Sequence, residues 1–147
     1  MAKTAYELGF LAFLSAVFAG LTAVLTKIGV TGVDSNLATA VRTTVVLVFT
    51  WSLAFLANGK TIGALSRLSH RTWIFLIFSG VATGLSWLCY FRALQLGEAS
   101  RVAPVDKLSV VFAILFAAVL LREKVGWQQC LGSSFIVVGA IVLALKY

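Results

Sequence analysis

Four charged residues stand within or at the edges of long apolar stretches of the chain, and they are the first candidates for chemistry: Arg42, Arg92, Asp106 and Lys107. A charge at the centre of a membrane helix costs about 2.5–3.5 kcal/mol on insertion scales, and less near the helix ends. Arg92 and Lys107 have stems long enough to carry their charges toward water, whereas Arg42 lies deeper and Asp106 is short. One interpretation is an ion pair, of Asp106 with Arg42 or Lys107, that only orients helices. The other is a polar site that lines a vestibule for an anionic or zwitterionic solute.

The composition of the whole chain places these charges in a membrane. Of the 147 residues, 61% are hydrophobic and 12% are charged, and the mean hydropathy is +1.01. Soluble domains run at about 45–50% apolar and about 25% charged residues. The balance disfavours a soluble enzyme domain, a disordered chain and a disulfide scaffold.

Uncharged stretches predict five membrane-spanning helices. A span needs roughly 20 mostly apolar residues, and three uncharged stretches, of 19, 20 and 21 residues, reach that length directly. Two others, of 17 and 14 residues, reach it by including Arg42 in one case and Asp106 with Lys107 in the other. Backbone polar groups in lipid must be satisfied internally, which favours helices. We predict an all-α membrane protein with a single five-helix domain over residues 1–147 and spans near 8–27, 37–57, 73–94, 102–121 and 127–145.

The first span shares some features with a secretory signal peptide. The apolar run after Lys3 is longer than the signal core of about 7–15 residues, and Glu7 interrupts its basic flank. Four more spans follow. We therefore interpret this run as the first span rather than as a cleaved signal.

Lysine and arginine residues are nearly balanced between the two sides of the predicted membrane. With five spans, the side of the N-terminus has six of them, namely Lys3, Lys60, Arg67, Arg71, Arg122 and Lys124. The other side has four, namely Lys27, Arg92, Arg101 and Lys146, and six if Arg42 and Lys107 are added. The positive-inside rule favours a cytoplasmic N-terminus only weakly, so the chain is a candidate for insertion in both orientations. The net charge of +7 is spread over span ends, which indicates headgroup contacts rather than nucleic acid binding.

No motif for a metal, a nucleotide or a redox cofactor is found in the sequence. The CxxC, HExxH, P-loop and GxGxxG patterns are absent, and His70 is the single histidine. Cys89 and Cys130 fall inside predicted spans, where they are expected to pack as small apolar residues. We expect no cofactor and no covalent chemistry.

Polar and small residues recur at helical spacing in four of the spans, and each set lies on one side of its helix. Ordinary contacts between membrane helices would explain any one set, but four together favour a shared polar path. Trp87 and Tyr90 could wall this path, although packed or lipid-facing aromatic residues are just as common. The fourth set continues from Ser109 through Ala113 and Ala117. The candidates for the solute path are Thr22, Thr39, Arg42, Thr43, Thr83, Ser86, Trp87, Tyr90, Asp106, Lys107 and Ser109.

Glycines mark the surfaces where close helix packing is expected. The third span contains Gly80-x-x-x-Gly84, and Gly132 and Gly139 give the fifth span a smooth face. Small residues of this kind let helix backbones approach closely in a membrane. We predict helix contacts at these four glycines.

Several short motifs carry a family resemblance. They are Ala40-x-Arg42, the Tyr90-x-x-Ala93-Leu94 end of the third span, the Ala99-Ser100 loop, the Glu123 turn and the Gln129-x-x-Gly132 entry to the last span. With them, the chain resembles an EamA domain of the drug/metabolite transporter superfamily. It departs from the family pattern where Arg122 replaces a common Gly, where Ser109-Val110 replaces a Glu-Pro pair, and where Ala19-Gly20 replaces a Trp-Gly.

The resemblance implies a transporter in the cell membrane. Members resemble two copies of a five-helix unit, inserted in opposite senses around a solute path, and this chain has one copy. The first four helices of each unit line the path and the fifth packs outside. Inverted repeats serve alternating access, so a single copy would work as an antiparallel homodimer. The expected partners are the lipid bilayer, a second copy of the chain and a small metabolite or drug-like solute that is exported. The alternative function is that of a non-transporting subunit, which packs against a partner membrane protein.

Overall fold

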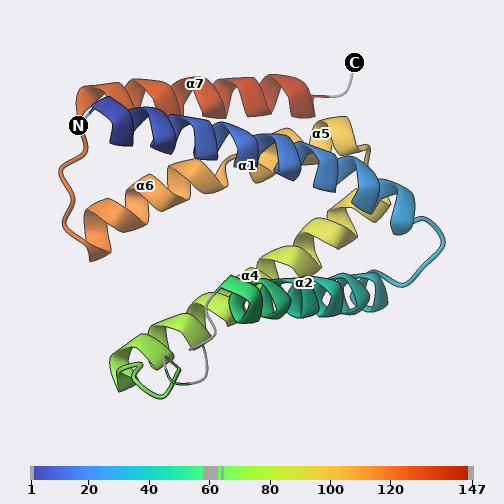
Figure 1. Cartoon of the computed structure of the whole chain (residues 1–147). Coiled ribbons are helices and arrows are strands. Elements are labelled where there is room, and N and C mark those ends of the chain that lie inside the picture. Colours follow the sequence, from blue (N-terminus) through green and yellow to red (C-terminus); the bar gives the residue numbers. More distant parts are fainter. Residues whose placement is uncertain (1, 58–62, 64, 146–147) are drawn as a thin grey trace. The chain divides into compact units, whose positions relative to one another are not determined.

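The computed structural model describes residues 2–57, 63 and 65–145, and Figure 1 shows its helices. Lys60 and Lys146, which entered the topology count, lie outside the described residues. No strand occurs in the described part of the chain. Five stretches are long and apolar enough to cross a membrane, namely Tyr6–Gly29, Ser35–Leu56, His70–Leu96, Ala99–Leu120 and Trp127–Ala144. The predicted all-α architecture with five spans is confirmed.

The chain divides into two units. One unit, Gly29–Gln95, contains α2 (Ser35–Ala57) and α4 (His70–Leu96). The other unit contains four helices, which are α1 (Ala2–Gly29), α5 (Ala99–Asp106), α6 (Ser109–Leu120) and α7 (Trp127–Ala144).

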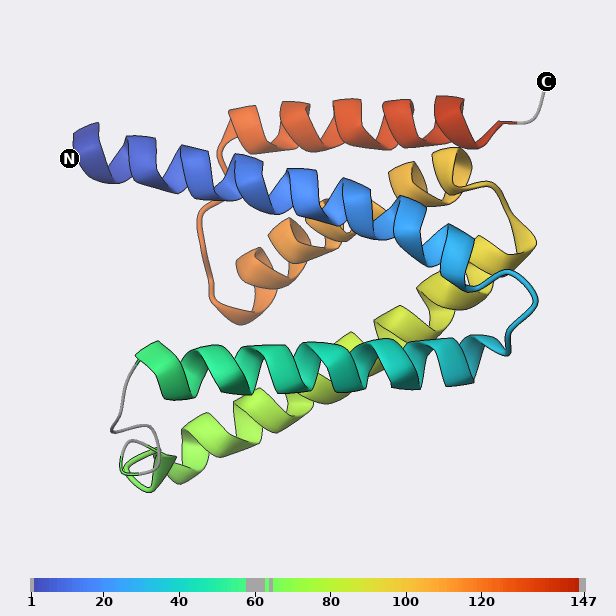
Figure 2. The same ribbon diagram turned by 45° about the vertical axis from the view of Figure 1, so that its right-hand side comes forward.

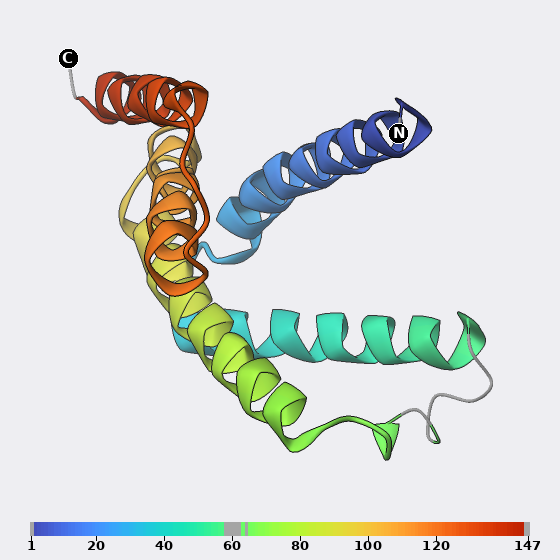
Figure 3. The ribbon, with the colours of Figure 1, turned by 90° about the vertical axis from the view of Figure 1, so that its left-hand side faces the viewer.

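In the unit of α2 and α4, the two helices run in opposite directions, and the start of α2 lies beside the C-terminal half of α4 (Figure 3). The buried side chains gather at this end, where Val30, Phe91 and Leu94 are at most 3% exposed. The side-chain amide of Gln95 donates hydrogen bonds to the carbonyl oxygens of Val30 and Val33. The turn before α2 is therefore fixed to the end of α4 by both apolar packing and hydrogen bonds.

Side chains cap the beginning of both helices in this unit. The Asp34 carboxylate accepts the N–H groups of Asn36 and Leu37 at 2.9 and 3.0 Å, so it satisfies two free donors at the start of α2. The Ser69 hydroxyl accepts the N–H of Thr72 at 3.1 Å and does the same for α4. The helix starts thus follow from local sequence.

In the other unit, α7 packs on α5 and α6 and runs in the opposite direction to them (Figure 2). Its one buried side chain, among those described, is Ala140. The end of α1 is attached to the segment before α5, because Lys27 Nζ donates to the Gly97 carbonyl oxygen at 2.7 Å.

The fourth predicted span, 102–121, begins earlier than expected and is not one continuous helix. The helical segment starts at Ala99, α5 ends at Asp106 and α6 starts at Ser109. Across the break, the N–H groups of Lys107 and Leu108 bind the carbonyls three residues back, at 3.1 and 3.0 Å. Pro104, within α5, has no N–H and its ring crowds the turn before it, so it weakens α5 ahead of the break. The break places Asp106 at the end of α5 and Lys107 between α5 and α6.

Arg122, in the loop after α6, has a left-handed backbone with a φ of 57°. This conformation costs a residue with a Cβ about 1–2 kcal/mol, and glycine avoids the cost. We expect Arg122→Gly to raise the free energy of unfolding by about 0.5–1 kcal/mol, since part of the gain is offset by the larger entropy of glycine in the unfolded chain. Thermal unfolding in detergent measures the change. The matched control is Arg122→Ala, which removes the charge but keeps the Cβ; an equal gain in that variant would attribute the effect to charge.

Candidate functional site

A cation–π contact joins α2 to α4. The guanidinium carbon of Arg42 lies 4.3 Å from the centroid of the Trp87 ring and 5.5 Å from that of Phe91. Arg42 and Trp87 are half-buried, and Phe91 is buried. A cation this close to an aromatic face gains about 0.5–2 kcal/mol, depending on how far it is desolvated. The structure therefore brings together two residues, Arg42 and Trp87, that the sequence assigned to the path.

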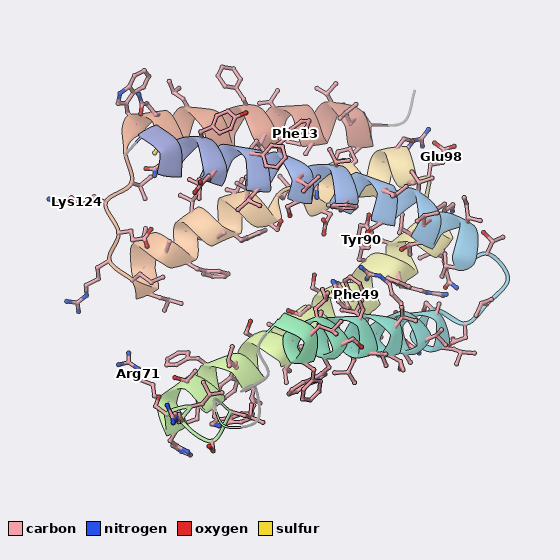
Figure 4. The ribbon with its side chains drawn as sticks, in the orientation of Figure 1. Phe13, Phe49, Arg71, Tyr90, Glu98 and Lys124 are labelled. Atoms are coloured by element: carbon pink, nitrogen blue, oxygen red, sulfur yellow. The ribbon has the colours of Figure 1, made fainter. Side chains whose placement is uncertain are left out.

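The helical period explains the aromatic side of this contact. Trp87 and Phe91 are four residues apart, so their rings lie one above the other on the same face of α4. Tyr90 is the third aromatic residue of this turn, and Figure 4 shows it on the C-terminal half of α4. The sequence pattern indicated Trp87 and Tyr90 but missed Phe91, because an apolar ring in a membrane span carries no signal of its own.

No acidic side chain of its own unit neutralises Arg42. Asp34 is the one acidic residue between Gly29 and Gln95, and its carboxylate caps α2. The planar guanidinium is held by a ring and has five N–H donors in a fixed fork, the arrangement that suits a carboxylate or phosphate. Arg42 can therefore bind an anionic group at a defined position within a membrane span.

A second network lies at the charged end of α4. Arg92 Nη1 donates to Gln95 Oε1 at 2.9 Å, and the amide nitrogen of Gln95 binds the turn before α2. Arg92, interpreted as a residue that extends toward water, is exposed and also braces this turn. Sequence reasoning missed Gln95, since a single glutamine near a span end gives no indication of its partners.

Asp106 has Lys107 as its ion-pair partner, with 3.6 Å between Lys107 Nζ and Asp106 Oδ2. This is one of the two pairings that the sequence left open. Arg42 lies in the other unit, so its predicted pairing with Asp106 stays a prediction. Ser109 is exposed at the start of α6, directly after the break, and Thr22 is half-buried on α1.

Three of the four threonine hydroxyls of the predicted path donate to their own helices. Thr39 binds the Ser35 carbonyl at 2.7 Å, Thr43 binds the Thr39 carbonyl at 2.7 Å, and Thr83 binds the Ser79 carbonyl at 2.9 Å. Each hydroxyl oxygen keeps its capacity to accept a hydrogen bond. Ser86, one turn after Thr83, is exposed. The three threonines therefore offer acceptors rather than donors.

The glycines predicted to pack have open space around them within their own units. A Cβ built at any of the four would meet no described atom within 4 Å; these are Gly80, Gly84, Gly132 and Gly139. Close packing at these positions is not formed inside either unit, and it stays a prediction for contacts with a second chain. The described residues also contain no cluster of three or more His, Cys, Asp or Glu side chains.

The comparison with known families covers almost the whole chain, because the model of the EamA-like transporter family matches residues 8–145. This chain belongs to the EamA-like transporter family. A relative from Sinorhizobium sp, described as an uncharacterized transporter in the cobO 3' region, is 48% identical over 136 residues, which cover 92% of this chain and 95% of the relative. No solved structure matches.

As an EamA-like protein, the chain is a multi-pass membrane transporter whose environment is the lipid bilayer. The family resemblance also gains a physical explanation at two positions. Leu94, which ends the Tyr90-x-x-Ala93-Leu94 motif, is 0% exposed. Arg122, where the family often has Gly, has the left-handed backbone that glycine adopts most easily.

Proposed function

We propose that this EamA-like protein exports a small metabolite or drug-like solute with an anionic group, and that it works as an antiparallel homodimer. The observation that carries the proposal is the Arg42 guanidinium stacked on Trp87, without an acidic partner in its unit. A fixed charge inside a span is costly, and such charges usually serve function. The anionic group of a solute would neutralise this charge during passage.

The remaining candidates suit the rest of such a solute. The hydroxyl oxygens of Thr39, Thr43 and Thr83 accept hydrogen bonds, so they can bind N–H or O–H groups. Trp87 and Tyr90 offer flat faces beside them. We propose that Thr22, Ser86, Asp106, Lys107 and Ser109 complete the path, with α7 outside it.

The proposal of a homodimer rests on the one five-helix unit that the family match covers, residues 8–145. An inverted pair of units is a general arrangement for alternating access, and one chain with five spans can provide it only by inserting in both senses. The near balance of lysine and arginine across the membrane supports dual insertion. The open surroundings of Gly80, Gly84, Gly132 and Gly139 leave room for a second copy.

Dual insertion predicts that one loop is accessible from both membrane faces. In a background with Cys89→Ser and Cys130→Ser, Leu65→Cys should react with a membrane-impermeant maleimide from either face to a comparable extent. The matched control is Val33→Cys, on the turn predicted for the opposite side, which should show the same two-sided labelling. If Leu65→Cys were labelled from one membrane face only and Val33→Cys from the other face only, the antiparallel dimer would be contradicted. A parallel dimer or a heteromeric partner would then remain.

A non-transporting subunit is the second candidate. It is favoured by the intrahelical hydrogen bonds of the threonines, since hydroxyls satisfied in this way also occur in helices that only pack. Counterflow of an anionic solute library in liposomes that contain only the purified protein distinguishes the two functions. Flux from the protein alone rejects the subunit, and flux that requires a second protein rejects the homodimer.

A further inference from the structure

A pocket lies between α6, the start of α7 and the loop that joins them. Its volume is about 320 Å³. One wall is the Val110–Ala117 face of α6, and the loop residues Glu123 and Lys124 form its other end, with Gln129 of α7. The Ala113 and Ala117 end of the fourth polar seam therefore faces this pocket.

The polarity of the pocket changes along its length. The wall on α6 is aliphatic, whereas Glu123 and Lys124 are exposed and of opposite charge. Figure 4 shows Lys124 extending outward from the loop. Trp127, the first residue of α7, is 71% exposed, as expected of an aromatic residue at the level of the lipid headgroups. The apolar end thus points into the bilayer and the charged end lies at its surface.

We propose that this pocket binds a zwitterionic phospholipid. The upper part of one acyl chain lies along the Val110–Ala117 face, Lys124 binds the phosphate, and Glu123 binds the ammonium of the headgroup. The pocket is apolar toward the bilayer interior and charged toward the bilayer surface, as a phospholipid in a leaflet is. The two charges that line the pocket, Glu123 and Lys124, cancel, so its rim complements a headgroup of both charges better than an anionic one.

Native mass spectrometry of the detergent-purified chain tests the lipid site. The probe is an equimolar mixture of palmitoyl-oleoyl phosphatidylethanolamine and palmitoyl-oleoyl phosphatidylglycerol. The unmodified protein should retain the phosphatidylethanolamine preferentially. Lys124→Gln and Glu123→Gln should each lower that retention about fivefold, the effect of one headgroup charge contact. Both residues are exposed, so these variants are expected to fold.

The control is Arg71→Gln, which removes one positive charge from the first turn of α4, predicted on the same face. The lipid retention of this variant should stay unchanged. Ala117→Phe fills the pocket and should lower retention whatever the headgroup. Equal retention of the two lipids, with no effect of Lys124→Gln, would overturn the proposal. So would an Ala117→Phe variant that dissociates into monomers with its lipid retained, because the pocket would then belong to an interface with a second copy.

Discussion

Arg42→Gln is expected to lower solute flux about 30-fold or more, because removing one partner of a desolvated charge pair costs about 2–5 kcal/mol. The yield and thermal stability of the variant should change little, since the cation–π contact with Trp87 contributes only about 0.5–2 kcal/mol. Arg42→Lys should recover flux only in part, because an ammonium cannot form the bidentate contact of a guanidinium. Flux into liposomes, measured beside the melting temperature in detergent, provides both values.

Two further variants separate binding from packing at Arg42. If Arg42 only attaches α2 to α4, then Arg42→Gln and Trp87→Ala should lower the melting temperature alike, and the double variant should be no worse than either. If Arg42 binds solute, Arg42→Gln should lower flux more than Trp87→Ala does.

The double variant Arg42→Gln with Asp106→Asn tests the predicted ion pair, because a buried charge without its partner is the costly state. Transport recovered in that double variant would refute the binding site.

Leu94→Ala is expected to lower the free energy of unfolding by about 2–5 kcal/mol, the usual cost of a buried leucine truncated to alanine. Leu94 is 0% exposed, and the residue that follows it, Gln95, binds the turn before α2. Loss of this packing should also disturb the register of Arg42 over Trp87, so we expect flux to fall with stability. Unfolding in mixed micelles with increasing denaturing detergent measures the free energy.

The control for Leu94 is Leu85→Ala on the same helix. Leu85 is 60% exposed, and a side chain that faces lipid loses little when it is shortened, because lipid tails are as apolar as leucine. Its unfolding free energy should change by less than about 0.5 kcal/mol. If both variants lost the same unfolding free energy, a second chain would have to cover Leu85. The stability would then not depend on burial within one chain alone.

The number of spans was predictable from the sequence because hydropathy is a local property. A stretch of roughly 20 apolar residues must cross the bilayer as a helix whatever its neighbours are. The break in the fourth span was not predicted, although Pro104 lies three residues before it. A proline in a membrane helix is often accommodated by a kink, so the sequence did not reveal that the hydrogen bonding changes at Lys107 and Leu108.

By itself, the sequence determined the family, the five spans and the residue types that can bind an anion. The tertiary structure decided which of these residues meet. Arg42 lies on Trp87 because Leu94 and Gln95 fix the end of α4 against the turn at Val30 and so set the register of the two helices. Helical periodicity gives the face of one helix but not the axial offset between two. That offset depends on side chains far apart in the sequence, and their packing is a property of the folded chain alone.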